Sequence, residues 1–280
     1  MYKTKLCIAI GNFGIDAESQ IRLFKEKGFD GFFSDWNEDM TKYRELADEL
    51  GMIYQSVHAP FRKAAVLWTD SKEADEAVEE LKRCIDDCAR VNVPILVMHT
   101  YIGFEPSNGP TEAGLVNYGK IVKYAAEKGI KIAFENTEGE EYLAALMEHF
   151  KDCENVGYCW DSGHEQCYSH SKDLLALYGD RLIATHLNDN LGVSRYDGEI
   201  YWTDDLHLLP FDGVIDWADA ADRLNKCGYE GYLTFELNTK SKSSRRENDK
   251  YDKMDIEDYV AEAYARACRV AFLKLRRKDK

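Results

Sequence analysis

Short apolar runs alternate with longer amphipathic stretches along the whole chain. Eight runs rich in Val, Ile, Phe and Tyr predict β-strands at residues 5–11, 30–35, 52–58, 94–99, 131–136, 156–161, 182–187 and 232–237. Between the runs, apolar residues recur at the three- and four-residue spacing of one helix face. The clearest helical stretches are residues 17–28, 41–51, 71–91, 112–129 and 256–275. Strict alternation of the two patterns indicates a parallel sheet covered by helices.

Eight strand–helix units in succession predict an α/β protein of the (β/α)8 TIM barrel class. The 280 residues fit this fold, whose usual length is about 250 residues. An open doubly wound sheet is disfavoured, because GNFG at 11–14 is neither the GxGxxG fingerprint nor a P-loop. With only five prolines and no Gly/Ser-rich linker, residues 1–280 are predicted to form a single domain.

Two connections near the C-terminus are unusually long. Residues 188–213 follow the seventh run and contain Trp202, Asp205 and His207. Loops of this length in compact domains are generally functional or disordered, so this one is predicted to be a lid. Residues 238–255 follow the eighth run and are polar and charged.

The charge balance narrows the classes of partner. With 36 basic and 51 acidic residues the net charge is −15, which opposes broad contact with nucleic acid or an anionic membrane. No apolar run reaches membrane-spanning length, and the first residues lack the apolar segment of a signal peptide. The eight cysteines contain no CxxC pair and are interpreted as reduced thiols of a cytoplasmic protein. The sequence leaves open whether chains associate into a homo-oligomer.

Metal-ligand side chains stand where the predicted strands end. Glu135, Asp161, His186 and Glu236 close the fifth to eighth runs, and the ends of consecutive barrel strands converge at one mouth. Three carboxylates so close together would repel unless protons or a cation neutralised them. Together with one imidazole they suit a divalent cation, namely Mn²⁺, Zn²⁺, Mg²⁺ or Co²⁺.

A second group of ligand-type residues follows other runs or lies in the long connection. Its members are His58, His99, His164, Asp205 and His207. His164 comes three residues after Asp161, and Asp205 and His207 are separated by one residue. One ion is the simplest expectation, and up to three ions fit this larger set. His58 and His99 also fit the role of hydrogen-bonded histidines at the barrel mouth.

These strand ends resemble the xylose isomerase-like superfamily, which holds sugar phosphate isomerases, ketose 3-epimerases and the endonuclease IV (AP endonuclease family 2) proteins. The resemblance covers nearly the whole chain. The ketose 3-epimerase pattern implies that Glu135, Asp161, His186 and Glu236 hold one ion. In this pattern both glutamates are also the catalytic acid–base pair, and His164 lies near the substrate. The endonuclease IV pattern implies three zinc ions on all nine residues, with Glu135 bridging two of them and with His164, Asp205 and His207 holding the third.

The segment from His186 to Trp217 resembles the sugar isomerase branch, in which an Asp-x-His element followed by Leu-Pro and Gly-x-Ile-Asp-Trp is common. The resemblance therefore implies a metal-dependent isomerase or epimerase of a sugar or sugar phosphate. Glu135 and Glu236 would move the proton through a metal-stabilised enediolate. Two alternatives remain: a trinuclear zinc phosphodiesterase like endonuclease IV, and a barrel that binds sugar and metal without turnover.

Aromatic and cationic residues near the strand ends are candidates for substrate contact. Trp36 and Trp202 are predicted to stack on a sugar, with packing of the barrel or loops as the alternative. The same two interpretations apply to Phe33, Tyr101, Phe104 and Trp160. Arg62 follows the third run and is predicted to bind a phosphate or carboxylate of the substrate, unless it forms a surface salt bridge.

Overall fold

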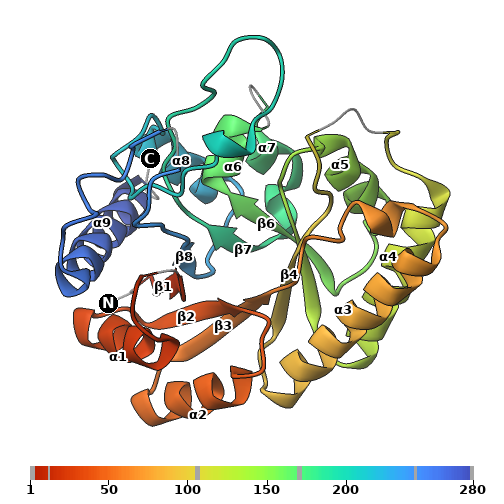
Figure 1. The fold of residues 1–280 in the computed structure, drawn as a ribbon, viewed down its shortest axis with the longest axis horizontal. Coiled ribbons are helices and arrows are strands. Elements are labelled where there is room, and N and C mark those ends of the chain that lie inside the picture. Colours follow the sequence, from red (N-terminus) through yellow and green to blue (C-terminus); the bar gives the residue numbers. More distant parts are fainter. Residues whose placement is uncertain (1–3, 12, 105–107, 169–171, 243–244, 278–280) are drawn as a thin grey trace.

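The computed structural model describes residues 4–11, 13–104, 108–168, 172–242 and 245–277. Eight parallel strands form a barrel surrounded by helices (Figure 1). The strands are β1 Leu6–Ala9, β2 Gly31–Asp35, β3 Ile53–His58, β4 Ile95–His99, β5 Lys131–Glu135, β6 Val156–Asp161, β7 Leu182–His186 and β8 Leu233–Phe235. Each lies within a predicted run, and all pair in parallel, so the predicted (β/α)8 TIM barrel is confirmed.

The sheet closes into a barrel between β7 and β8. Hydrogen-bonded neighbours follow the order β7-β6-β5-β4-β3-β2-β1-β8. Leu187, just past β7, forms a parallel bridge with Phe235 of β8. Its backbone N–H donates to Thr234 O at 2.8 Å and its carbonyl accepts from Glu236 N at 3.1 Å. This closure brings the ends of all eight strands to one mouth.

Side-chain caps mark where several of the helices begin. They are α1 Ala17–Lys27, α2 Met40–Leu50, α3 Lys72–Arg90, α4 Glu112–Glu127, α5 Glu140–His149, α6 Ser162–Cys167, α7 Leu174–Tyr178, α8 Trp217–Lys226 and α9 Ile256–Arg277. The described residues also form three short 3₁₀ turns, η1 Val66–Trp68, η2 Gly179–Arg181 and η3 Trp202–Asp204. Asp16, Ser71 and Thr111 cap α1, α3 and α4 by accepting a hydrogen bond from a backbone N–H of the first turn.

α9 packs beside α1 and α8 and completes the helical ring (Figure 1). No described helix is both long enough and apolar enough to cross a membrane.

The barrel interior is filled with small side chains below the mouth. Val97, Ala133, Cys159 and Ala184 form a buried cluster contributed by β4 to β7. Each of these residues lies two positions before the last residue of its strand, and side chains two apart point to the same face. The residues that end these strands therefore also point inward, one layer nearer the mouth.

The long connection 188–213 is folded around Asp189. The buried Asp189 carboxylate accepts from the backbone N–H of Phe211 at 2.8 Å, that of Ile215 at 3.1 Å, and Trp217 Nε1 at 2.9 Å. A Cβ at Gly213 would lie 2.2 Å from the Asp189 carboxylate, so a larger residue does not fit there. This anchor fixes the path of the connection toward α8.

The second long connection is tied to the first and to α9 by charged side chains. Arg245 Nη1 lies 2.8 Å from Asp204 Oδ1, and Asp204 is buried. Asp212 accepts from Arg266 at 2.6 Å, lies 2.8 Å from Lys250 Nζ, and accepts from the Tyr251 hydroxyl. The two segments therefore support each other above the barrel.

We expect Asp212→Asn to lower the free energy of unfolding by about 1.5–3 kcal/mol at pH 7, the usual contribution of hydrogen bonds to charged groups. Burial opposes ionisation of Asp212, but Lys250, Tyr251 and Arg266 outweigh it and hold its pKa below the usual value. A depressed carboxyl pKa stabilises the fold fully above about pH 4. This contribution is lost as the pH falls through the folded-state pKa, so the gap to the parent protein should narrow in acid.

Urea unfolding between pH 7 and pH 3.5 measures this gap. Asp249→Asn is the matched control, because Asp249 pairs with the exposed Arg246 on the same connection. Equal stability of Asp212→Asn and the parent at pH 7, or a gap that widens in acid, would contradict the expectation.

Candidate metal centre

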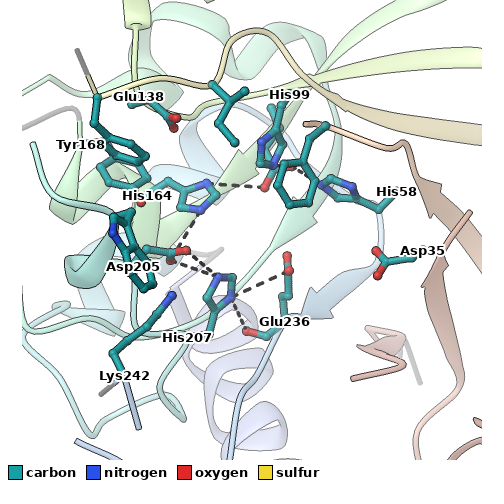
Figure 2. A pocket seen from close by; sticks show the side chains of 15 residues that line it. Asp35, His58, His99, Glu138, His164, Tyr168, Asp205, His207, Glu236 and Lys242 are labelled. Atoms are coloured by element: carbon teal, nitrogen blue, oxygen red, sulfur yellow. Dashed lines mark hydrogen bonds and ion pairs between the residues drawn. The ribbon is translucent and has the colours of Figure 1, made fainter. Parts of the chain in front are cut away.

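A cavity of about 450 Å³ opens at the mouth of the barrel, above the ends of the strands. Histidines and carboxylates line most of it, together with several aromatic side chains (Figure 2). The lining residues are Asp35, His58, Phe61, His99, Ile102, Phe104, Glu135, Glu138, His164, Tyr168, Trp202, Asp205, His207, Glu236 and Lys242. Seven of the nine predicted ligands therefore line this cavity, whereas Asp161 and His186 are buried and do not line it.

Glu135 lies at the centre of this cluster and is fully buried. One carboxylate oxygen lies 3.2 Å from His58 Nε2 and 3.5 Å from His99 Nε2. The other lies 3.0 Å from His186 Nδ1 and 3.7 Å from His164 Nδ1. One protonated imidazole is enough to neutralise a carboxylate, but four imidazoles surround that of Glu135. They offer the nitrogen ligands that Zn²⁺ and related ions prefer.

Glu135, Asp161, His186 and Glu236 form the first complete ligand group. Their ligand atoms all lie within 4.8 Å of one another. His186 Nδ1 lies between two carboxylates, 3.0 Å from Glu135 and 2.9 Å from Glu236. One imidazole nitrogen carries at most one proton, whereas a divalent cation balances several carboxylates at once. The donor set therefore fits a cation.

The remaining candidates form two further groups. One group consists of His58, His99 and Glu135, and the other of His164, Asp205 and His207. Within each group the ligand atoms, imidazole nitrogens and carboxylate oxygens, lie within 4.8 Å of one another. Asp205 Oδ1 is 3.5 Å from His164 Nε2 and 3.0 Å from His207 Nε2. His207 has a positive φ of 51°, a conformation that is uncommon for a non-glycine residue and clusters at functional sites.

The outer nitrogens of three histidines are held by backbone carbonyls. His58 Nδ1 lies 2.8 Å from Ala59 O, His164 Nδ1 lies 2.9 Å from Asn136 O, and His207 Nδ1 lies 3.3 Å from Glu236 O. If each Nδ1–H donates to its carbonyl, each Nε2 keeps a lone pair that faces the cluster. Metal-binding histidines are oriented in this way, so this arrangement also fits the implied metal.

Protons on most of the imidazoles neutralise the carboxylates in this arrangement; His99 is the exception, because burial lowers its pKa to about 3. Burial opposes ionisation of Glu135, but His186 and His58 outweigh it and hold the Glu135 pKa well below its usual value. Burial likewise opposes protonation of His207, but Asp205 and Glu236 raise its pKa to about 9. Burial raises the pKa of Asp161 to about 6, against the effect of His164. A bound cation would take the place of such protons, because ligand imidazoles must be neutral.

Two asparagines fix Asp161. Its side chain accepts from Asn188 Nδ2 at 2.9 Å and from the backbone N–H of His164 at 2.7 Å, where Asp161 caps α6. Its backbone N–H donates to Asn136 Oδ1 at 2.9 Å. Asn136 and Asn188 follow the strand ends by one or two residues, and the sequence offered no further sign of their role.

Gly163 leaves the space that Asn188 occupies. A Cβ at Gly163 would lie 1.9 Å from Asn188 Oδ1. We expect Gly163→Ala to displace Asn188 from Asp161 and to weaken divalent-cation affinity by about 10–100-fold, the usual effect of losing a partner of a ligand. Calorimetric titration with Mn²⁺ measures this affinity. Gly119→Ala is the control, since its Cβ meets nothing within 4 Å; an unchanged affinity in Gly163→Ala would count against the expectation.

Other residues in or beside the cavity were not singled out from the sequence. Asp35 is the last residue of β2, just as several predicted ligands are the last residues of their strands. Its place at a strand end was therefore the available signal. Cys159 lies within 4.8 Å of ligand atoms of Glu135 and His186, and its place two residues before Asp161 was the available signal. Lys242 lies in the second long connection, where no pattern marks it.

The predicted substrate contacts divide between two places. Trp202 lines the central cavity with 55% of its surface exposed, and Lys242 Nζ lies 5.1 Å from its ring. Trp36 and Arg62 do not line the central cavity; they line a second cavity beside it. Trp36 Nε1 donates to Asp87 Oδ2 at 2.8 Å, which turns the indole toward α3.

Most of the other candidate aromatic residues are packing residues. Phe33 is buried and stacks on His186, with ring centroids 4.5 Å apart. Trp160 is buried and donates to Glu165 at 3.1 Å. Tyr101 stacks on Tyr142 at 4.1 Å. Phe104 does line the cavity.

Residues 21–258 match the family model described as Xylose isomerase-like TIM barrel, and the chain belongs to this family. The protein y4fM of Sinorhizobium fredii (strain NBRC 101917 / NGR234) is 29% identical over 291 residues, covering 88% of this chain and 90% of that protein. L-ribulose 3-epimerase has a similar structure, with a TM-score of 0.74 at 15% identity over 99% of this chain and 97% of that one. 3-keto-D-glucoside 4-epimerase of E. coli has a TM-score of 0.71 at 15% identity, covering 95% and 100%.

Proposed function

We propose that the protein is a divalent-metal-dependent epimerase or isomerase of a keto sugar. The observation that carries the proposal is the grouping of Glu135, Asp161, His186 and Glu236 within 4.8 Å at the mouth of the barrel. The cavity above them, about 450 Å³, falls in the size range of small-molecule sites. The similarity to structures of sugar epimerases supports a carbohydrate substrate.

Glu135, Asp161, His186 and Glu236 would hold the cation, with Mn²⁺, Zn²⁺, Mg²⁺ and Co²⁺ as candidates. The bound cation would supply Lewis acidity to the carbonyl and neighbouring hydroxyl of an open-chain sugar, which acidifies the adjacent C–H and stabilises the enediolate. Glu135 and Glu236 come from β5 and from the end of β8 and differ in access. The Glu236 side chain is 28% exposed and that of Glu135 only 1%.

Glu236 is the better placed base. Burial opposes its ionisation, but His186 and His207 outweigh this and lower its pKa to about 2, so the carboxylate is ionised at neutral pH. Glu236 would take the proton as the C–H bond breaks and its electron pair shifts toward the carbonyl. Glu135 would have to carry a proton in the reactive complex, and it would return that proton to the opposite face in epimerisation, or to the neighbouring carbon in isomerisation. The proton taken by Glu236 would pass to solvent, and Glu135 would regain one from there, so that the cycle closes. His164, in the cavity wall, would orient a substrate hydroxyl.

Solvent exchange tests this chemistry directly. Protein loaded with Mn²⁺ is incubated in D₂O with a panel of ketoses, and deuterium at the carbon next to the carbonyl is followed by NMR. We expect deuterium to be incorporated at a rate that depends on the amount of protein and on the amount of metal. Absence of exchange in every ketose of the panel would overturn the proposal.

A second candidate function is a trinuclear zinc phosphodiesterase. The three ligand groups described above favour it, because together they use all nine predicted ligands. These groups are His58, His99 and Glu135; Glu135, Asp161, His186 and Glu236; and His164, Asp205 and His207. The net charge of −15 opposes it, and so do the acidic residues Asp35, Glu138 and Asp205 of the cavity, because DNA binding requires phosphate neutralisation.

Two measurements separate the candidate functions: elemental analysis of the protein for bound metal, and a cleavage assay on an abasic-site oligonucleotide. One ion per chain without cleavage supports the isomerase; three zinc ions with cleavage support the hydrolase; tight sugar binding with neither activity supports a non-catalytic barrel.

A further inference from the structure

A second cavity of about 330 Å³ adjoins the candidate metal centre. It shares Asp35, His58 and Phe61 with the central cavity, so the two spaces have a common wall. Asp35 and His58 lie on one side of the central cavity, opposite Tyr168, Asp205 and Lys242 (Figure 2). The second cavity therefore extends the site away from the two long connections.

The lining of the second cavity combines aromatic faces with polar charged groups. Besides the shared residues, it consists of Trp36, Ala59, Pro60, Arg62, Lys63 and Glu80. Trp36 is held in place by its hydrogen bond to Asp87 and by packing on the core. Phe61 lies edge-on to His58, with ring centroids 5.8 Å apart. Rigid aromatic walls with a few charged groups suit a ligand that has apolar ring faces and hydroxyls at its edges.

The charges in this lining favour a neutral ligand over a phosphate. Lys63 Nζ lies 3.0 Å from Glu80 Oε2, so this cation is already paired. Arg62 is exposed and faces a cavity that also contains the carboxylate of Asp35. The cations Arg62 and Lys63 are thus balanced by Asp35 and Glu80. The shared His58 is paired with Glu135 at 3.2 Å, so no excess positive charge remains to attract an anion.

We propose that the second cavity binds a second sugar unit, so that the substrate is a glycoside or disaccharide rather than a single sugar. This inference rests on the proposed function, because it places the reacting keto sugar in the central cavity. Ligand pockets span roughly 300–1,000 Å³, and each of the two cavities reaches that size by itself. Asp35 stands at their common wall, where it would accept hydrogen bonds from hydroxyls of both units.

The test compares one-unit and two-unit ketoses on protein loaded with Mn²⁺. Deuterium exchange is measured for D-fructose and for two ketose disaccharides, isomaltulose and lactulose. We expect a higher kcat/KM for at least one disaccharide than for D-fructose. Trp36→Ala should lower the disaccharide-to-fructose ratio about tenfold, because the stacking surface of the second unit is lost.

Two variants control for indirect effects. Trp36→Phe keeps one six-membered aromatic ring but loses the rest of the indole, including the N–H that reaches Asp87, so it should preserve most of the ratio. Phe272→Ala removes an exposed aromatic side chain of α9 that lines neither cavity, and it should leave the ratio unchanged.

The outcomes separate this inference from the proposed function. If D-fructose and the disaccharides exchange equally well, or the ratio is the same in Trp36→Ala, the second subsite is refuted and the epimerase proposal stands. If none of the three sugars exchanges, calorimetric binding of isomaltulose decides the subsite by itself. Weaker binding to Trp36→Ala than to the parent supports it, whereas equal or absent binding overturns it.

Discussion

Glu236→Gln should lower the exchange rate about a thousandfold while leaving the fold intact, within the range that a positioned acid or base contributes. The Glu236 side chain faces the cavity and its carboxylate lies 2.9 Å from His186 Nδ1. Glutamine has nearly the same shape and keeps one oxygen for a cation, but it cannot accept a proton from carbon. Turnover in a ketose panel and deuterium incorporation measure the loss.

Metal content distinguishes a lost base from a lost ligand. Glu236→Gln that retains its cation and no longer exchanges supports the acid–base role. Glu154→Gln is the matched control, since Glu154 is exposed on the turn before β6. Near-normal rates in Glu236→Gln would show that another group removes the proton.

Chelation of the divalent cation should abolish turnover and lower the melting temperature. The ligand group of Glu135, Asp161, His186 and Glu236 concentrates negative charge in a buried place, and a cation stabilises only the folded state that assembles it. At free ion a hundred times its Kd, such binding adds about 2.7 kcal/mol, which amounts to a shift of several degrees for a domain of this size.

Thermal unfolding and activity before and after EDTA measure both effects. Addition of Mn²⁺, Zn²⁺, Mg²⁺ or Co²⁺ in turn should restore them, and the ion that restores the highest rate identifies the preferred metal. Glu135→Gln should show a smaller metal-dependent shift, because it removes the carboxylate at the centre of the cluster. Full activity in protein shown by elemental analysis to be free of divalent metal would contradict the expectation.

The fold was predictable because a buried parallel strand has a simple signature. Such strands are covered on both faces, so in the sequence they appear as continuous apolar runs. For example, the strand predicted at residues 94–99 is β4 Ile95–His99 in the structure. The grouping of the candidate ligand side chains was predictable for a related reason. Glu135, Asp161 and His186 are the last residues of their strands, so the topology alone brought them together.

Residues outside the strand ends were not predictable in the same way. Trp36 follows β2 directly, yet the backbone turns its indole toward Asp87 and the second cavity. Lys242 reaches the central cavity from a connection whose path depends on distant ion pairs such as Arg245–Asp204. Contacts of this kind depend on loop conformation, and the local pattern of polar and apolar residues does not encode it.

The sequence by itself determined the number and order of the strands and the side chains that stand at their ends. These features follow from local periodicity and from the rule that parallel strands finish at one edge. Only the tertiary structure decided that Asn188 holds Asp161 across the space left by Gly163. It alone also revealed the second cavity beside His58, because cavities and side-chain partners arise where segments far apart in the chain pack together.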